Sequence, residues 1–192
     1  MGSVTRTIRL DEEVDRAITE IAVKTRTNAN LLRNKILRKY VELDYYAERF
    51  GVIMMFAASV NKIMEKLDDE EIEELAKWTG QYVFKEYVMF SFKTVNLRTV
   101  LKAIRLWGLM ENFRYEESIK DGMYHIICQH DKSEKWCLYY RETLRAIFSE
   151  LLSIDTSIEN TEHQILIVFP DSDGKTNVKR TVSVGGRVDY YR

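Results

Sequence analysis

Apolar and polar residues alternate along the start of the chain, and a helical period then replaces this alternation. The stretch Val4–Leu10 alternates the two kinds of side chain and is rich in β-branched residues, which predicts a short strand. Asp11 offers an N-cap, and apolar residues then recur from Val14 at the spacing of one helical face. This pattern predicts a first helix that runs to about Lys24.

A second helix follows a short break at residues 25–27. Asn28 is its N-cap candidate, and apolar residues then return at every fourth position, at Leu32, Ile36 and Tyr40. Gly51 interrupts the chain soon afterwards, so the boundary between two domains is expected between Asp44 and Gly51. We take the domains as 1–48 and 49–192.

The second domain is expected to begin with helices and to end with strands. A buried helix is predicted over Val52–Leu67, an amphipathic helix with an acidic start over residues 68–89, and a third helix that ends near Gly108. The Asp-Gly pair at 121–122 is a strong hairpin signal. Further elements are predicted as strands at 112–119 and 123–130, a helix at 133–152, and strands at 157–161, 163–169 and 178–184. The fold class is therefore α+β, with an antiparallel β-β-α-β-β arrangement in the second domain.

The strand and two helices of the first domain are too small to bury their apolar faces alone. Two chains that pair their strands and interlock their four helices would solve this problem. Alternation then puts Val4, Ile8 and Leu10 inward and leaves Thr5, Thr7 and Arg9 on the outer face. A two-stranded ribbon fits the DNA major groove, where an arginine can donate two hydrogen bonds to guanine. The free amides of Ala29 and Asn30, at the start of the second helix, are suited to a phosphate.

These residues resemble a known family. The segments Thr7–Glu13, Asn28–Leu32 and Ile36–Val41 are similar in order, spacing and polarity to the ribbon-helix-helix repressors of the CopG, Arc and methionine-repressor type. The resemblance covers about a fifth of the chain and implies a DNA-binding homodimer with a β-α-α module. Many members carry glycine where this chain has Arg26, an apolar residue at the position of Arg33, and a polar residue at the position of Leu31. The DNA-binding residues are expected to be Thr5, Arg6, Thr7, Arg9, Lys24, Arg26, Asn28, Ala29 and Asn30.

The distribution of charge along the chain agrees with this interpretation better than the net charge of the whole chain does. The net charge of the 192 residues is -1. Residues 1–41 contain nine basic and five acidic residues, a balance of +4, which leaves -5 for the remainder. Such an asymmetry is typical of a nucleic-acid module joined to an ordinary globular domain.

The second domain contains residues that suit a metal. Cys128 and His130 share one face of a predicted strand, and Cys137 lies one turn into the following helix. Thiolate and imidazole are ligands for zinc, nickel or copper, so a transition metal is one candidate cofactor. The alternative is that the cysteines are buried as small apolar residues and the histidine merely ends a strand.

The same region also contains the residues of a small-molecule pocket. Backbone amides between strand and helix can hold an anion, with His130 and Lys135 beside it and Trp136 and Tyr140 as walls. The alternative is an ordinary capped helix whose aromatic side chains lie in the core. The second domain is thus expected to bind an effector, to drive oligomerisation to a dimer or tetramer, or both.

Other classes of protein are less consistent with the sequence. It contains no phosphate-binding glycine loop, nucleophile elbow or paired Cys-x-x-Cys motif, so we do not expect an enzyme. The two cysteines, the absence of an apolar signal region and the short apolar runs favour a cytoplasmic protein without a membrane span.

The sequence thus predicts a transcriptional regulator of prokaryotic type that binds double-stranded DNA. Two other interpretations remain open. One is a DNA-binding antitoxin whose second domain holds a protein toxin, and the other is an architectural scaffold that uses the first domain only to dimerise.

Overall fold

The computed structural model describes residue 4, residues 6–171 and residues 182–184. Within this part the chain divides after Ala47 into two compact units. Helices and strands both occur, and the strands form one antiparallel sheet, so the predicted α+β class is confirmed. None of the helices in the described residues combines the length and the apolar character that crossing a bilayer requires.

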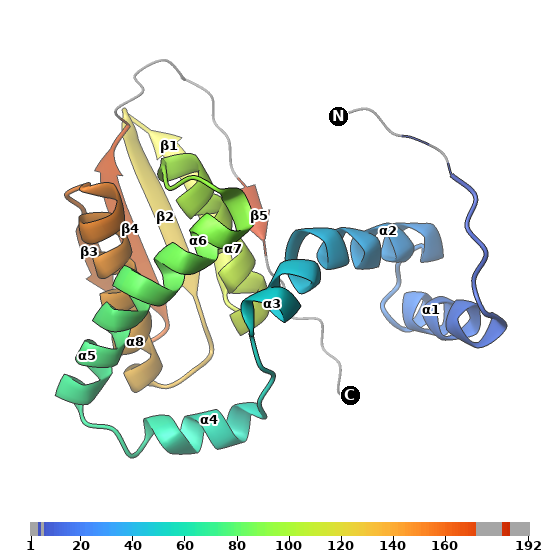
Figure 1. Ribbon diagram of the computed structural model, residues 1–192, viewed down its shortest axis with the longest axis horizontal. Coiled ribbons are helices and arrows are strands. Elements are labelled where there is room, and N and C mark those ends of the chain that lie inside the picture. The colour runs from blue at the N-terminus through green and yellow to red at the C-terminus, as the bar shows by residue number, and fades with distance from the viewer. Residues whose placement is uncertain (1–3, 5, 172–181, 185–192) are drawn as a thin grey trace. The chain divides into compact units, whose positions relative to one another are not determined.

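The N-terminal unit is built from helices that follow one another closely (Figure 1). Helix α1 spans Glu12–Lys24 and α2 spans Ala29–Lys39, and both agree with the predicted helices. A π-helical turn, η1 at Tyr40–Asp44, and helix α3 at Tyr45–Phe50 continue α2 without a break. The second helix therefore extends to the predicted boundary near Gly51, whose φ of 87° ends it.

This unit has a very small core of its own. Of its described residues, only Ala22 and Leu43 are buried. Most of its apolar side chains are exposed, including Val4, Ile8, Val14, Ile21, Val23, Leu31, Ile36, Leu37, Tyr40 and Val41. A single copy leaves the apolar stripes of both helices in water, which is the condition in which small modules gain stability from a partner.

The second unit begins with a series of helices. Helix α4 covers Ala57–Met64, and a long helix follows, made of α5 at Asp69–Trp78, the π-turn η2 at Thr79–Val83 and α6 at Phe84–Phe92. Asp68 caps α5 in a reciprocal capping box with Glu71, which confirms the predicted acidic start. Helix α7 covers Leu97–Glu111 and is capped by Asn96.

The strands form one sheet in the order β3-β4-β2-β1-β5. Strands β1 at Arg114–Lys120 and β2 at Met123–Gln129 form the predicted hairpin, in which Asp121 and Gly122 both have positive φ. Helix α8 at Glu134–Ala146 and the π-turn η3 at Ile147–Leu151 follow. The remaining strands are β3 at Ser157–Asn160, β4 at Gln164–Pro170 and β5 at Val182–Val184. Residues 178–181 of the last predicted strand lie outside the described residues.

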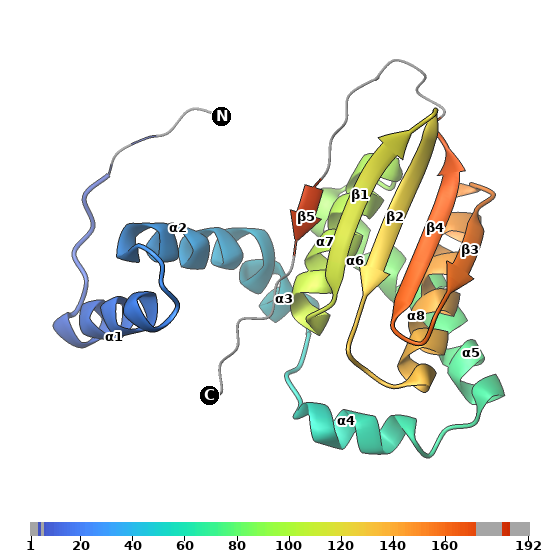
Figure 2. The ribbon, with the colours of Figure 1, turned by 180° about the vertical axis from the view of Figure 1, so that it is seen from behind.

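The helices of this unit cover one face of the sheet (Figure 2). Alternate residues of the central strands point to that face and are buried, among them Ile126, Cys128, Ile165, Ile167 and Phe169. Aromatic side chains fill the space between the helices, and Trp107 contacts Phe84, Phe113 and Tyr140 edge to face. The core of the protein therefore lies in the second unit.

The predicted buried helix over Val52–Leu67 is wrong in its first part, and in the helix that does form, α4, only Met64 is buried. Residues 52–56 are not helical, and their side chains are exposed, with Met54 fully exposed and Phe56 at 86%. The helix starts only at Ala57. A run of five consecutive apolar residues has no period, so the pattern cannot distinguish a buried helix from an exposed connection.

Candidate nucleic-acid interface

The segment before α1 is extended and exposed. Residue 4 and residues 6–10 belong to no strand, and Val4 and Ile8 are 74% and 53% exposed. The predicted strand is therefore not formed within the described part of a single chain. A strand needs a partner for its backbone groups, and the described residues of the unit offer the segment none. Thr7 and Arg9 are exposed, whereas Thr5 lies outside the described residues.

The turn between α1 and α2 depends on an arginine in a left-handed conformation. Arg26 has a φ of 51°, and its N–H donates to the carbonyl of Val23 at 3.1 Å. The neighbouring Thr27 N–H donates to Ala22 at 2.9 Å. This is the conformation in which helices commonly end with glycine. The turn between α1 and α2 thus has a positive φ at a residue with a positively charged side chain.

The N-terminus of α2 is capped by its own asparagine. The Asn28 side chain accepts from the backbone N–H of Asn30 at 2.8 Å and of Leu31 at 3.4 Å. The expectation that the Asn30 amide is free was therefore wrong, because an asparagine cap uses that donor. No hydrogen bond from the N–H of Ala29 occurs among the described residues, so of the two amides that were expected to be free, this one fits the expectation.

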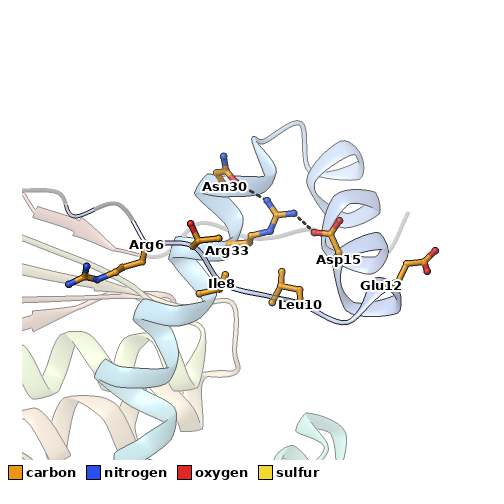
Figure 3. Close-up of a pocket in the computed structure, with 8 residues that line it drawn as sticks. Arg6, Ile8, Leu10, Glu12, Asp15, Asn30 and Arg33 are labelled. Atoms are coloured by element: carbon orange, nitrogen blue, oxygen red, sulfur yellow. Dashed lines mark hydrogen bonds and ion pairs between the residues drawn. The ribbon is translucent and has the colours of Figure 1, made fainter.

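Arg33 joins the two helices. Its guanidinium pairs with the Asp15 carboxylate on α1 and donates to Asn30 Oδ1 at 2.7 Å (Figure 3). Its Nε is buried without a partner in the described residues. The guanidinium of Arg33 is thus engaged within the unit, so Arg33 is not a free DNA contact.

An open hollow of about 590 Å³ lies between the extended segment and the two helices. Figure 3 shows the side chains around it, with the ion pair between Arg33 and Asp15 on one side and Ile8 and Leu10 on the other. The full lining is Arg6, Thr7, Ile8, Leu10, Glu12, Asp15, Asn30 and Arg33.

The structure gathers only part of the predicted DNA-binding set. It brings Arg6, Thr7 and Asn30 to one hollow, whereas Arg9, Lys24 and Arg26 are exposed outside its lining. Sequence reasoning missed Asp15 and Glu12 as neighbours of the extended segment. The unusual arginine at position 33 was the signal that a carboxylate would lie opposite.

The residues of the predicted effector pocket lie in the core of the second unit. His130, Trp136 and Tyr140 are buried, and the Tyr140 ring contacts the other two at 5.4 and 5.5 Å between centroids. Trp136 Nε1 donates to Asn61 Oδ1 at 2.7 Å. Lys135 points elsewhere, because its ammonium donates to the backbone carbonyl of Leu67.

A lysine that the sequence did not single out lies at this cluster instead. Lys132 Nζ is 2.6 Å from Glu111 Oε2, 2.5 Å from the Tyr140 hydroxyl and 4.2 Å from the centre of the Trp136 ring. Burial and the Glu111 carboxylate raise the pKa of Tyr140 above its ordinary value. This arrangement is an internal cation–π and ion-pair cluster that closes the loop between β2 and α8.

The three predicted metal ligands do not form a metal-binding group. No set of three or more histidine, cysteine, aspartate or glutamate side chains with suitable placement occurs in the described residues. Burial raises the pKa of the Cys128 thiol to about 12 and also raises the pKa of Cys137. Cys137 Sγ donates to the carbonyl of Thr161 at 3.1 Å. Both cysteines have the environment of small core residues.

The surroundings of His130 favour its neutral form. Its Nδ1 accepts from the Lys132 N–H at 3.3 Å, and its Nε2 is buried without a partner in the described part of the chain. Burial, followed by the charges of His163 and Lys132, lowers the pKa of His130. The positive charge of Lys132, which helps to lower the pKa of His130, also disfavours a further cation at this side chain.

Comparisons with known proteins complete these observations. No protein-family model matches the chain, and a search of curated proteins found no relative of it.

Proposed function

We propose that this protein is a sequence-specific DNA-binding transcriptional regulator of the prokaryotic cytoplasm, which acts as a homodimer through an N-terminal ribbon-helix-helix module. The observation that carries the proposal is the segment of residues 6–10, which is exposed at residues 6–9 and has no strand partner among the described residues. It lies directly before two helices on which most apolar residues face solvent. A second copy satisfies both needs at once, since strand pairing covers the backbone and helix packing covers the apolar stripes.

In the proposed dimer, the paired segments enter the major groove as a two-stranded ribbon. Ile8 turns to the helices, and Thr7 and Arg9 project to the base edges, where Arg9 donates two hydrogen bonds to guanine O6 and N7. Thr5 extends the same outward row by alternation.

Phosphate contacts come from the ends of the helices. The N–H of Ala29 lies at the positive end of α2, and the exposed Lys24 and Arg26 lie nearby in the chain, at the end of α1 and in the turn. These contacts fix the position of the ribbon on DNA and do not depend on sequence. The second unit is assigned to oligomerisation or to sensing a ligand.

The experiment that tests this function starts from selection of binding sequences out of a random DNA pool with the full chain. Fluorescence anisotropy then compares the selected duplex with a scrambled duplex over a series of salt concentrations. We expect the selected duplex to bind at least about 10³-fold more tightly, and affinity for both to fall steeply with salt.

Variants of Arg9 separate base reading from charge. Arg9→Lys keeps the charge but loses the two parallel hydrogen bonds, so it should reduce discrimination by about tenfold or more while binding to scrambled DNA is kept. Arg98→Ala, an exposed arginine on α7, is the matched control and should change neither value. Equal weakening on both duplexes by Arg9→Lys would show that Arg9 does not read bases. A dimer that binds neither duplex would favour the scaffold interpretation.

A further inference from the structure

The long helix formed by α5, η2 and α6 has two apolar faces. One face packs into the core through Ile72, Ala76, Gly80, Phe84 and Val88, all of which are buried. The other face carries Leu75, Trp78, Tyr82 and Met89, which are 38%, 53%, 59% and 44% exposed. These four residues are called the α5–α6 stripe below. Figure 1 shows both helices on the side of the domain that faces away from the sheet.

The stripe has the composition and rigidity of a protein interface. Tryptophan and tyrosine are the residues that most often dominate binding energy at interfaces, and aromatic residues and methionine are enriched there relative to the rest of the protein surface. The helix is fixed by the Asp68 capping box and by close packing of Gly80 against α8, where a Cβ would meet Ala146 Cβ at 2.8 Å. The stripe therefore presents a preorganised surface, which lowers the entropic cost of association.

The charges on this helix identify the partner. Residues 69–76 carry five acidic side chains and no basic one. Residues 77–93 carry three lysines, at 77, 85 and 93, and one acid, Glu86. The first half thus has a charge of -5 and the second half +2. A second copy of the same helix in antiparallel orientation places each acidic half beside a basic half, whereas parallel pairing places like charges together.

The spacing of the stripe agrees with a twofold axis at Tyr82. Leu75 and Met89 both lie seven residues from Tyr82, so Leu75 of one copy faces Met89 of the other across such an axis. Glu71 and Lys93 both lie eleven residues from Tyr82, so the acidic Glu71 of one copy lies beside the basic Lys93 of the other. An isologous contact of this kind buries the same patch on both copies.

We propose that the α5–α6 stripe pairs with the same stripe of a second copy, antiparallel and centred on Tyr82. This contact is separate from the proposed DNA-binding ribbon and gives the second unit its own role in assembly. With both contacts present, dimers joined at their ribbons associate further through their second units.

Cysteine crosslinking tests the geometry directly. Tyr82→Cys places two thiols across the axis within disulfide reach, so mild oxidation should give an intermolecular disulfide on a non-reducing gel. Glu70→Cys is the matched control on the same helix. It lies twelve residues away, so the two copies of that position are about 36 Å apart in the antiparallel pair and should not crosslink. Wild-type chain, whose cysteines are buried, gives the background.

The crosslinking results have clear opposite meanings. A disulfide at position 82 and none at position 70 supports the proposal. No crosslink at position 82, or equal crosslinking at both positions, overturns it.

Sedimentation separates this contact from the ribbon. In the Ile8→Asp background, which prevents the ribbon from packing, we expect the chain to remain associated, and Tyr82→Arg should then raise the dissociation constant more than about tenfold. The stripe proposal is overturned if the Ile8→Asp variant is already monomeric. It is also overturned if adding Tyr82→Arg to that variant does not change the mass of the assembly. If only the proposed ribbon contact is absent, the result is different, because the assemblies of the wild type and of Ile8→Asp then have the same mass.

Discussion

Arg33 on α2 donates to the carboxylate of Asp15 on α1, and this ion pair ties together the two helices of the N-terminal unit. The Arg33 side chain is 22% exposed and the Asp15 side chain is 51% exposed, so water screens the pair only in part. The additional hydrogen bond to Asn30 holds the guanidinium in one orientation.

The pair should show a measurable but modest coupling energy. We expect Asp15→Asn and Arg33→Leu to couple by about 0.5–1 kcal/mol in a double-mutant cycle, because the interaction is partly exposed. Urea unfolding of the four variants gives the value. A coupling of zero would show that the contact does not contribute to stability.

The left-handed conformation of Arg26 predicts a stabilising substitution. A side chain at a positive φ of 51° costs about 1–2 kcal/mol, and glycine avoids this cost but loses more entropy on folding. Arg26→Gly should therefore stabilise the protein by about 0.5–1 kcal/mol in urea unfolding. Arg26→Ala is the control, since it removes the charge without relieving the backbone, and it should not stabilise. DNA binding should weaken equally in both variants if Arg26 contacts phosphate.

Gly80 should not tolerate even a methyl group. A Cβ at this position would lie 2.8 Å from Ala146 Cβ and 2.8 Å from the Thr143 carbonyl oxygen. Alanine gains about 1 kcal/mol in helix propensity, but overpacking against backbone costs about 1–3 kcal/mol. We expect Gly80→Ala to lower stability by about 1 kcal/mol. A rise in the thermal midpoint would show that α8 shifts away at little cost.

The burial of His130 predicts a dependence of stability on pH. Burial and the nearby His163 and Lys132 lower the pKa of His130, whereas the unfolded chain keeps the ordinary value of about 6.5. The unfolded state therefore binds the proton first as pH falls. The stability contributed by neutral His130 is complete above about pH 6.5 and is lost as pH falls through the folded-state pKa.

Thermal midpoints measured over this range test the effect. The wild-type midpoint should fall more between about pH 7.5 and 5 than that of His130→Gln, whose side chain does not titrate. Parallel curves for the two proteins would contradict the assignment to His130.

The two cysteines should be unreactive in the folded protein. Both are buried, and burial raises the pKa of Cys128 to about 12, so the reactive thiolate is scarce at neutral pH. We expect a thiol reagent such as dithionitrobenzoate to label neither residue quickly at pH 7, and to label both after denaturation. Fast labelling of one thiol in the native protein would show that its environment opens in solution.

Much of the fold could be predicted because local signals and tertiary packing agree. Asn28 does cap a helix, Asp121-Gly122 does turn a hairpin, and the acidic residues after Asp68 do begin a helix. Each of these signals acts over a few residues and needs no distant contact. The α+β class follows from the order of such elements.

The candidate site was only partly predictable, for a physical reason. Arg33 on α2 pairs with Asp15 on α1, and Lys132 contacts Glu111 and Tyr140. The partners are too far apart in the sequence for a local pattern to encode these contacts. The apolar run at residues 52–56 shows the same limit, since burial depends on whether another surface covers it.

The sequence alone determined where most of the helices and the hairpin lie, because propensity, capping and period are local properties of the chain. Only the tertiary structure decided which charges are held internally, that Lys132 and not Lys135 joins the aromatic cluster, and that Trp78 and Tyr82 remain uncovered. Those features depend on which surfaces meet after folding, and a one-dimensional pattern carries no such information.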